Sequence, residues 1–258
     1  MKKIIYAVLA ASLSLFIVGC EHIDLSSRNS VTYSCTPEVY EHVRLGYNGG
    51  VDGPITVTQG TLKVGKTSSS VYFIGLSGTE TGDTEELQNQ ATSWLTDLQS
   101  GFCLDNDYLK AVVNVIASEI PAGSNIMLSG HSLGGMIAQQ VAADSYVKEN
   151  YNVLYTLTFG SPLLAAGSRE GTTYRLGDVS DVVPYLSGSL FNNTLWAVLG
   201  LNRENGGYGL DFLAAHSKSY ARTDVWGKYD AVGKKNGNAK LTIDLDTLAY
   251  YHAPTCWW

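Results

Sequence analysis

A serine flanked by glycines is the feature of this chain best suited to chemistry. Residues 126–135 read I-M-L-S-G-H-S-L-G-G, so an aliphatic run leads into the turn Gly130–Gly134 and a helical pattern follows. This strand–G-x-S-x-G–helix order is typical of a nucleophile elbow, where glycines let the two backbones approach closely. Ser132 is therefore a candidate nucleophile, and the Leu133 N–H, at a helix start, is a candidate oxyanion donor. A glycine-rich turn with an inert serine is the alternative.

Catalysis by such a serine needs an imidazole that takes the hydroxyl proton and a carboxylate that orients the imidazole. When the nucleophile occupies a G-x-S-x-G turn, the acid and then the base follow it along the chain. His216 and His252 are the histidines that follow Ser132. We expect His216 to be the base, with His252 as the alternative. His131 lies inside the turn and is expected to be a packed or hydrogen-bonded ring rather than a catalyst.

The acid is expected in a loop at the carboxyl end of a strand, where ligands and catalytic groups of such sheets gather. A stretch rich in β-forming residues at 172–176 is followed by G-D-V-S-D-V-V-P at 177–184. This loop offers two carboxylates, Asp178 and Asp181. Their position after the strand leaves both of them open as the acid.

Short apolar runs alternate with amphipathic stretches along most of the chain. Runs rich in β-branched and aliphatic residues predict strands at 55–64, 71–76, 125–128, 153–159 and 172–176. Apolar residues at helical spacing predict helices at 85–98, 108–120 and 132–147. Strands separated by such helices indicate an α/β fold with a mostly parallel central sheet and helices on both faces.

Two regions near the carboxyl end allow alternative interpretations. Residues 190–201 are strongly apolar, and 202–209 form a predicted loop rich in glycine and asparagine. The apolar stretch is either a buried core helix or a wall over the site that receives acyl chains. The aromatic tail at 250–258 is either a docked terminal segment or an exposed surface.

The amino-terminal sequence is typical of an exported protein. Met-Lys-Lys is followed by an uncharged apolar stretch at 4–18, which is short for a transmembrane helix. Residues 17–20 resemble a bacterial lipobox, and this implies cleavage before Cys20 and lipidation of that cysteine. An ordinary cleaved signal or an uncleaved anchor are the alternatives. The predicted organisation is a signal peptide at 1–19, a lipidated cysteine and tether at 20–36, and one domain at 37–258.

The charge of the chain bears on its partners. The formal net charge is −7, and it becomes more negative when Lys2 and Lys3 leave with the signal. An acidic protein is not attracted to nucleic acid or anionic lipid, so membrane attachment would depend on the acyl anchor. Glu21, rather than Asp, follows Cys20, and this favours the outer membrane of a bacterial cell envelope.

The remaining cysteines are Cys35, Cys103 and Cys256. An exported chain can keep disulfides, and a bridge between Cys35 and Cys256, with Cys103 as a buried thiol, is one pairing that the sequence allows. The histidines are scattered, and neither H-x-x-x-H nor C-x-x-C spacing occurs. We therefore expect no metal site and no cofactor.

Five short motifs occur in order between residues 70 and 220. They are L-S-G-T at 76–79, G-H-S-L-G-G at 130–135, T-F-G-S-P at 158–162, D-V-V-P at 181–184, and His216 followed by Tyr220. Together they resemble class 3 lipases, the fungal-lipase-like branch of the α/β-hydrolases. The elbow alone is shared by many hydrolases, whereas the ordered set is much more specific.

The resemblance assigns roles residue by residue. It implies that Ser132 is the nucleophile, Asp181 the acid and His216 the base, with the backbone N–H groups of Thr79 and Leu133 as the oxyanion hole. It also implies an α/β-hydrolase fold and hydrolysis of lipid esters, of the triacylglycerol lipase or phospholipase A type, through an acyl-enzyme. The expected partners are a lipid ester and the membrane that holds the anchor, with no nucleic acid, and we expect a monomer.

The sequence departs from the family in three places, the last of which is a short interval between Asp181 and His216. Ser77 stands where the family has arginine, and the stretch at 80–86 is acidic and polar where many members place an apolar lid helix. The second departure favours a short-chain esterase or thioesterase as an alternative. A non-catalytic envelope lipoprotein that retains the hydrolase fold, and an acyltransferase that uses the same acyl-enzyme, are further alternatives.

Overall fold

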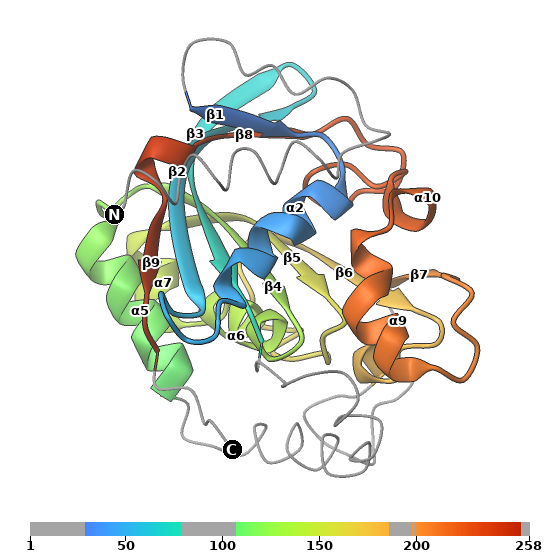
Figure 1. Cartoon of the computed structure of the whole chain (residues 1–258). Helices are drawn as coiled ribbons and strands as arrows, with labels where there is room; N and C mark the ends of the chain where they lie inside the picture. The colour runs from blue at the N-terminus through green and yellow to red at the C-terminus, as the bar shows by residue number, and fades with distance from the viewer. Residues whose placement is uncertain (1–28, 79–106, 186–197, 199, 254–258) are drawn as a thin grey trace.

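The computed structural model describes residues 29–78, 107–185, 198 and 200–253. The described strands form one sheet with the order β1-β8-β2-β3-β4-β5-β6-β7, and β9 also pairs with β2 (Figure 1). The strands are β1 (Ser30–Tyr33), β2 (Ile55–Val64), β3 (Thr67–Leu76), β4 (Asn125–His131), β5 (Asn152–Phe159), β6 (Thr172–Asp178), β7 (Leu201–Glu204), β8 (Lys240–Asp244) and β9 (Ala249–Tyr251).

The sheet is parallel from β3 to β7 and antiparallel at its other end. Each neighbouring pair from β3–β4 to β6–β7 runs parallel, whereas β1–β8, β8–β2, β2–β3 and β2–β9 are antiparallel. The parallel strands therefore present their carboxyl ends at one edge, where loops can gather catalytic side chains. The predicted α/β fold with a mostly parallel central sheet is confirmed.

Helices cover both faces of the sheet. They are α2 (Thr36–Val43), α5 (Asp107–Glu119), α6 (Leu133–Val141), α7 (Ser145–Asn150), α9 (Phe212–Lys218) and α10 (Thr223–Trp226), with short 3-10 turns η1 (Arg44–Gly46), η2 (Val183–Tyr185), η3 (Ser219–Ala221) and η4 (Leu245–Thr247). In Figure 1, α2 crosses in front of the strands. Residues of α5, α6 and α7 pack together in a separate core on the other face.

The two cores follow from the alternation of side chains along each strand. In β4, Met127 belongs to the core that also contains Val39 of α2 and Trp226 of α10. Its neighbours Ile126 and Leu128 belong to the core of α5, α6 and α7. A strand buried on both faces carries apolar residues at successive positions, which is why this stretch of sequence reads as a continuous aliphatic run.

Most sequence-predicted elements occur in the structure, with differences at their ends. β2 covers the predicted 55–64, and β3 begins earlier than predicted because it pairs in a hairpin with β2. The helix predicted at 132–147 is two helices, because the chain turns after Ala142 and Asp144 starts α7 by accepting a hydrogen bond from the Val147 N–H. The helix predicted at 85–98 lies outside the described residues.

Three edge regions differ from the sequence prediction. Residues 30–33, assigned to the tether at 20–36, form β1, because alternation buries Val31 and Tyr33 while β8 supplies the hydrogen bonds. The predicted loop 202–209 begins inside β7, which pairs with β6. The tail is docked through β9 on β2 as far as it is described. The preceding apolar stretch lies mostly outside the described residues.

No helix in the described ranges is both long enough and apolar enough to cross a membrane.

Candidate active site

Ser132 occupies a strained turn between β4 and α6. Its backbone has φ 55° and ψ −122°, a left-handed region that non-glycine residues rarely adopt. A Cβ on Gly130 would overlap the Gly134 carbonyl, and a Cβ on Gly134 would overlap the Leu76 carbonyl. The sequence expectation that these two positions need glycine is therefore confirmed. The turn is held by the Ser132 N–H, which donates to the Phe159 carbonyl at 3.0 Å.

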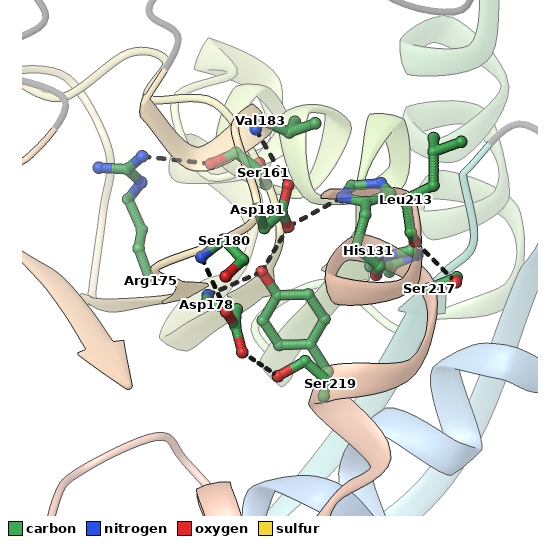
Figure 2. Close-up of polar contacts among 12 residues, drawn as sticks. His131, Ser161, Arg175, Asp178, Ser180, Asp181, Val183, Leu213, Ser217 and Ser219 are labelled. Carbon is green, nitrogen blue, oxygen red and sulfur yellow. Dashed lines mark hydrogen bonds and ion pairs between the residues drawn. The ribbon is translucent and has the colours of Figure 1, made fainter. Parts of the chain in front are cut away.

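Asp181 and His216 form a buried pair at the carboxyl ends of the strands. His216 lies on α9, and its Nδ1 is 2.9 Å from Asp181 Oδ2. The two side chains are 8% and 0% exposed, respectively. Figure 2 shows Asp181 and, as dashed lines, the hydrogen bonds that its carboxylate makes. Since a carboxylate accepts the Nδ1–H of a neutral imidazole, Nε2 is the nitrogen left to take a proton. This is the arrangement that a base and its orienting acid require.

Asp181 receives two further hydrogen bonds. The Tyr220 hydroxyl donates to Oδ2 at 2.6 Å, and the Val183 N–H donates to Oδ1 at 3.0 Å. Burial and the neighbouring Asp181 carboxylate raise the pKa of Tyr220 well above its usual value, so its hydroxyl keeps its proton. Three donors therefore fix the orientation of the carboxylate that faces His216.

The turn at the end of β5 connects Ser132 to this pair. Phe159 accepts the Ser132 N–H, and the next residue, Gly160, has φ 53°. A Cβ on Gly160 would lie 2.8 Å from Asp181 Oδ2 and 3.0 Å from His216 Nδ1. Residues 159–160 thus contact Ser132 through Phe159 and the Asp181–His216 pair through Gly160. Any side chain at Gly160 would push into the pair.

The alternative acid and base lie elsewhere or contact other groups. Asp178 ends β6, and its carboxylate accepts from the Ser180 N–H, the Gly206 N–H and the Ser219 hydroxyl. The Asp178 carboxylate therefore holds neighbouring backbone segments in place, whereas the Asp181 carboxylate contacts the His216 imidazole. His252 is exposed beside β9, which pairs with β2 on the far side of β3 from the elbow.

The predicted oxyanion hole is described in part. Leu133 is the first residue of α6, where a backbone N–H has no partner inside the helix. Gly78 lies against Ser132, since a Cβ on it would be 2.9 Å from Ser132 Cβ. Thr79, the predicted second donor, lies outside the described residues. So do Cys20, Cys103 and Cys256, and Cys35 is buried at the start of α2.

Two tyrosines near the site have roles that sequence reasoning missed. Tyr220 appears in a motif, but nothing in its spacing from His216 shows that its hydroxyl reaches Asp181. Tyr47 hydrogen-bonds His131 at 2.6 Å although 84 positions separate them. No local pattern marks such a distant contact, so only the fold reveals it.

Comparisons of the chain with protein-family models, with curated proteins and with solved structures found no match. The fold and the geometry of the site therefore carry the functional argument. Among the described side chains, no group of three or more His, Cys, Asp or Glu is placed to hold a metal ion.

Proposed function

We propose that this chain is a serine hydrolase of α/β-hydrolase type that cleaves carboxylic esters of lipids. The observation that carries the proposal is the buried His216–Asp181 hydrogen bond, which the Phe159–Gly160 turn connects to a serine held at positive φ between a strand and a helix. The ordered motifs that resemble class 3 lipases support the same roles. A nucleophile, a base and an acid in this order are sufficient for acyl transfer.

In the proposed reaction, His216 Nε2 takes the Ser132 hydroxyl proton as the oxygen attacks the ester carbonyl. Asp181 holds the ring and stabilises the imidazolium that forms. The Leu133 N–H at the start of α6 donates to the oxyanion, and the Thr79 N–H is the proposed second donor. His216 then protonates the leaving alcohol. Water activated by the same ring releases the acid from the acyl-enzyme.

Two exposed apolar side chains, which neighbour the acid and base segments in the sequence, support a lipid substrate. Val182, next to Asp181, is 39% exposed, and Leu210, just before α9, is 98% exposed. Single exposed apolar residues are common on protein surfaces, but these two flank the segments that carry the acid and the base. An apolar acyl chain or lipid surface would cover them.

A fluorophosphonate probe tests the catalytic serine. Folded wild-type protein is expected to become labelled at Ser132, and the variant Ser132→Ala is expected to remain unlabelled at unchanged unfolding temperature. Ser129→Ala, which changes a buried serine of β4, the strand before the turn, is the matched control and should label normally. A folded wild type that never reacts would instead indicate a non-catalytic protein that retains the fold.

A second assay separates the proposed substrate from the shorter esters. Turnover of long-chain and butyrate esters is measured above and below micelle formation. Higher turnover on long-chain esters at the interface supports the proposed lipid substrate. A preference for soluble butyrate esters, with Ser132→Ala inactive in both, would replace it with a short-chain esterase.

We also propose that lipidated Cys20 anchors the protein in a bacterial cell envelope. The sequence around Cys20 supports this proposal. Incorporation of a palmitate analogue into wild type but not into Cys20→Ala tests it, and recovery of both proteins in the membrane fraction without label would contradict it.

A further inference from the structure

His131, the residue before the nucleophile, hydrogen-bonds two segments from distant parts of the chain. Its Nδ1 is 2.6 Å from the Tyr47 hydroxyl, and its Nε2 is 3.0 Å from the backbone carbonyl of His216. The Tyr47 hydroxyl in turn accepts the Gly78 N–H at 2.8 Å. One imidazole thus connects the elbow with the backbone of the proposed base and with Gly78, just after β3.

The partners of His131 determine where its proton lies. A carbonyl oxygen can only accept, so His131 Nε2 must carry a hydrogen to bond with His216. In a neutral ring Nδ1 is then an acceptor, and the Tyr47 hydroxyl donates to it. That hydroxyl keeps a lone pair for the Gly78 N–H, so every donor in the chain of bonds meets an acceptor.

The surroundings of His131 favour the neutral ring. Its side chain is buried, and burial together with the adjacent His216 lowers the pKa of His131 well below its usual value. Within the described ranges, the titratable and charged groups that face the ring are Tyr40 of α2, Arg44 of η1, Tyr47, His216 of α9 and Tyr220 of η3. None of these is a carboxylate that would stabilise an imidazolium.

We infer that His131 is a positioning residue that, as the neutral Nε2–H tautomer, fixes the proposed base and the Gly78 turn relative to Ser132. The inference rests on the proposed function. The His131 and His216 rings are 4.6 Å apart between centroids, so the bond to the His216 carbonyl holds the backbone whose side chain must reach the serine. A shift of about 1 Å in such a group can cost about a hundredfold in rate.

A pair of variants tests this role through the rate of fluorophosphonate labelling. His131→Asn is too short to donate to the His216 carbonyl, and its labelling is expected to slow by about ten- to a hundredfold. His131→Gln can place an amide N–H near the position of Nε2, and its labelling should stay within about fivefold of wild type. His42→Gln is the matched control, because it changes another buried histidine that makes none of these contacts. It should label at the wild-type rate.

Nitrogen NMR of the wild-type protein measures the tautomer without reference to activity. A protonated Nε2 and an unprotonated Nδ1 on His131 across neutral pH support the inference. An Nδ1–H tautomer or a doubly protonated ring overturns the inference. So does a folded His131→Asn variant that labels as fast as wild type, or a His131→Gln variant that labels no faster than His131→Asn. If the wild type does not label at all, the proposed function fails, and the positioning role fails with it even where NMR finds the expected tautomer.

Discussion

Asp178 ends β6 and Asp181 lies in the loop that follows, and both are fully buried, yet their surroundings differ in kind. Asp178 accepts hydrogen bonds from two backbone N–H groups and the Ser219 hydroxyl, none of which changes protonation near neutral pH. Asp181 accepts one of its bonds from an imidazole. Burial alone therefore does not identify a catalytic acid. The partner must also exchange a proton and lie beside a nucleophile.

The two carboxylate sites are joined through Tyr220. Its hydroxyl donates to Asp181 and accepts the backbone N–H of Asp178 at 3.2 Å. The Asp178 carboxylate holds Ser219, the residue before Tyr220, and the Ser219 hydroxyl also accepts the Trp226 Nε1–H at 3.1 Å. Asp178 thus supports the site indirectly, by fixing the segment that carries the tyrosine.

The largest expected effect is that of Asp181→Asn on turnover. The amide can occupy the same space, but it cannot stabilise the imidazolium and it favours the wrong tautomer of His216. We expect kcat to fall by about ten-thousandfold, as when the corresponding acid of a serine protease is replaced. Steady-state hydrolysis of a soluble ester measures this. A fall in kcat of less than tenfold would show that Asp181 is not the catalytic acid. Asp178 and Asp181 would then no longer differ in function.

Asp178→Asn should affect stability instead. The new amide group would face donors that now bond to a carboxylate, and we expect the free energy of unfolding to fall by about 3 kcal/mol. Urea unfolding measures the loss, and kcat is compared at a temperature where the variant is folded. Turnover should stay within about tenfold of wild type, since the contact between Asp181 and His216 is intact. A loss of activity as large as that of Asp181→Asn, in folded protein, would assign the acid to Asp178.

Tyr220→Phe tests the connection between the two carboxylates and has a smaller expected effect. The variant removes one donor from Asp181 and leaves the ring packing in place. A lost hydrogen bond to a charged group predicts about 1.5 kcal/mol less stability and about tenfold lower kcat. Steady-state hydrolysis of a soluble ester and urea unfolding measure the two effects, and an unchanged kcat in folded Tyr220→Phe would indicate that Tyr220 contributes packing alone.

The sequence predicted the interior of the fold better than its edges. The strand at 55–64 and the elbow after 125–128 could be predicted because β-forming runs and glycine spacing act locally. β1 pairs with β8, so Ser30 lies opposite Asp244. No local sequence pattern predicts a pairing between residues so far apart in the chain. At the site, position after a strand could not separate Asp178 from Asp181, whereas the family motif favoured Asp181. The contact from Tyr47 to His131 depends entirely on tertiary packing.

The smallest expected effect on turnover belongs to His42, which instead limits the pH range in which the two carboxylates can be compared. His42 is completely buried, its Nδ1 contacts the Tyr33 hydroxyl, and burial lowers the pKa of His42 to about 3. In the unfolded chain a histidine titrates near pH 6.5. Between these values the unfolded chain binds a proton that the folded chain does not, so stability must decrease as the pH falls below about 6.5.

Urea unfolding at pH 7, 6 and 5 measures this dependence in wild type and in His42→Gln. Each such histidine contributes a limiting slope of about 1.4 kcal/mol per pH unit, so the variant should lose stability more gradually on acidification while kcat at pH 7 is unchanged. The same slope in both proteins would show that His42 is protonated in the folded state. If His42→Gln shows the shallower dependence, a loss of activity of Asp178→Asn below pH 6 is explained by unfolding of that variant. The activities of Asp178→Asn and Asp181→Asn are therefore compared at pH 7, where a difference reflects the chemistry of the site.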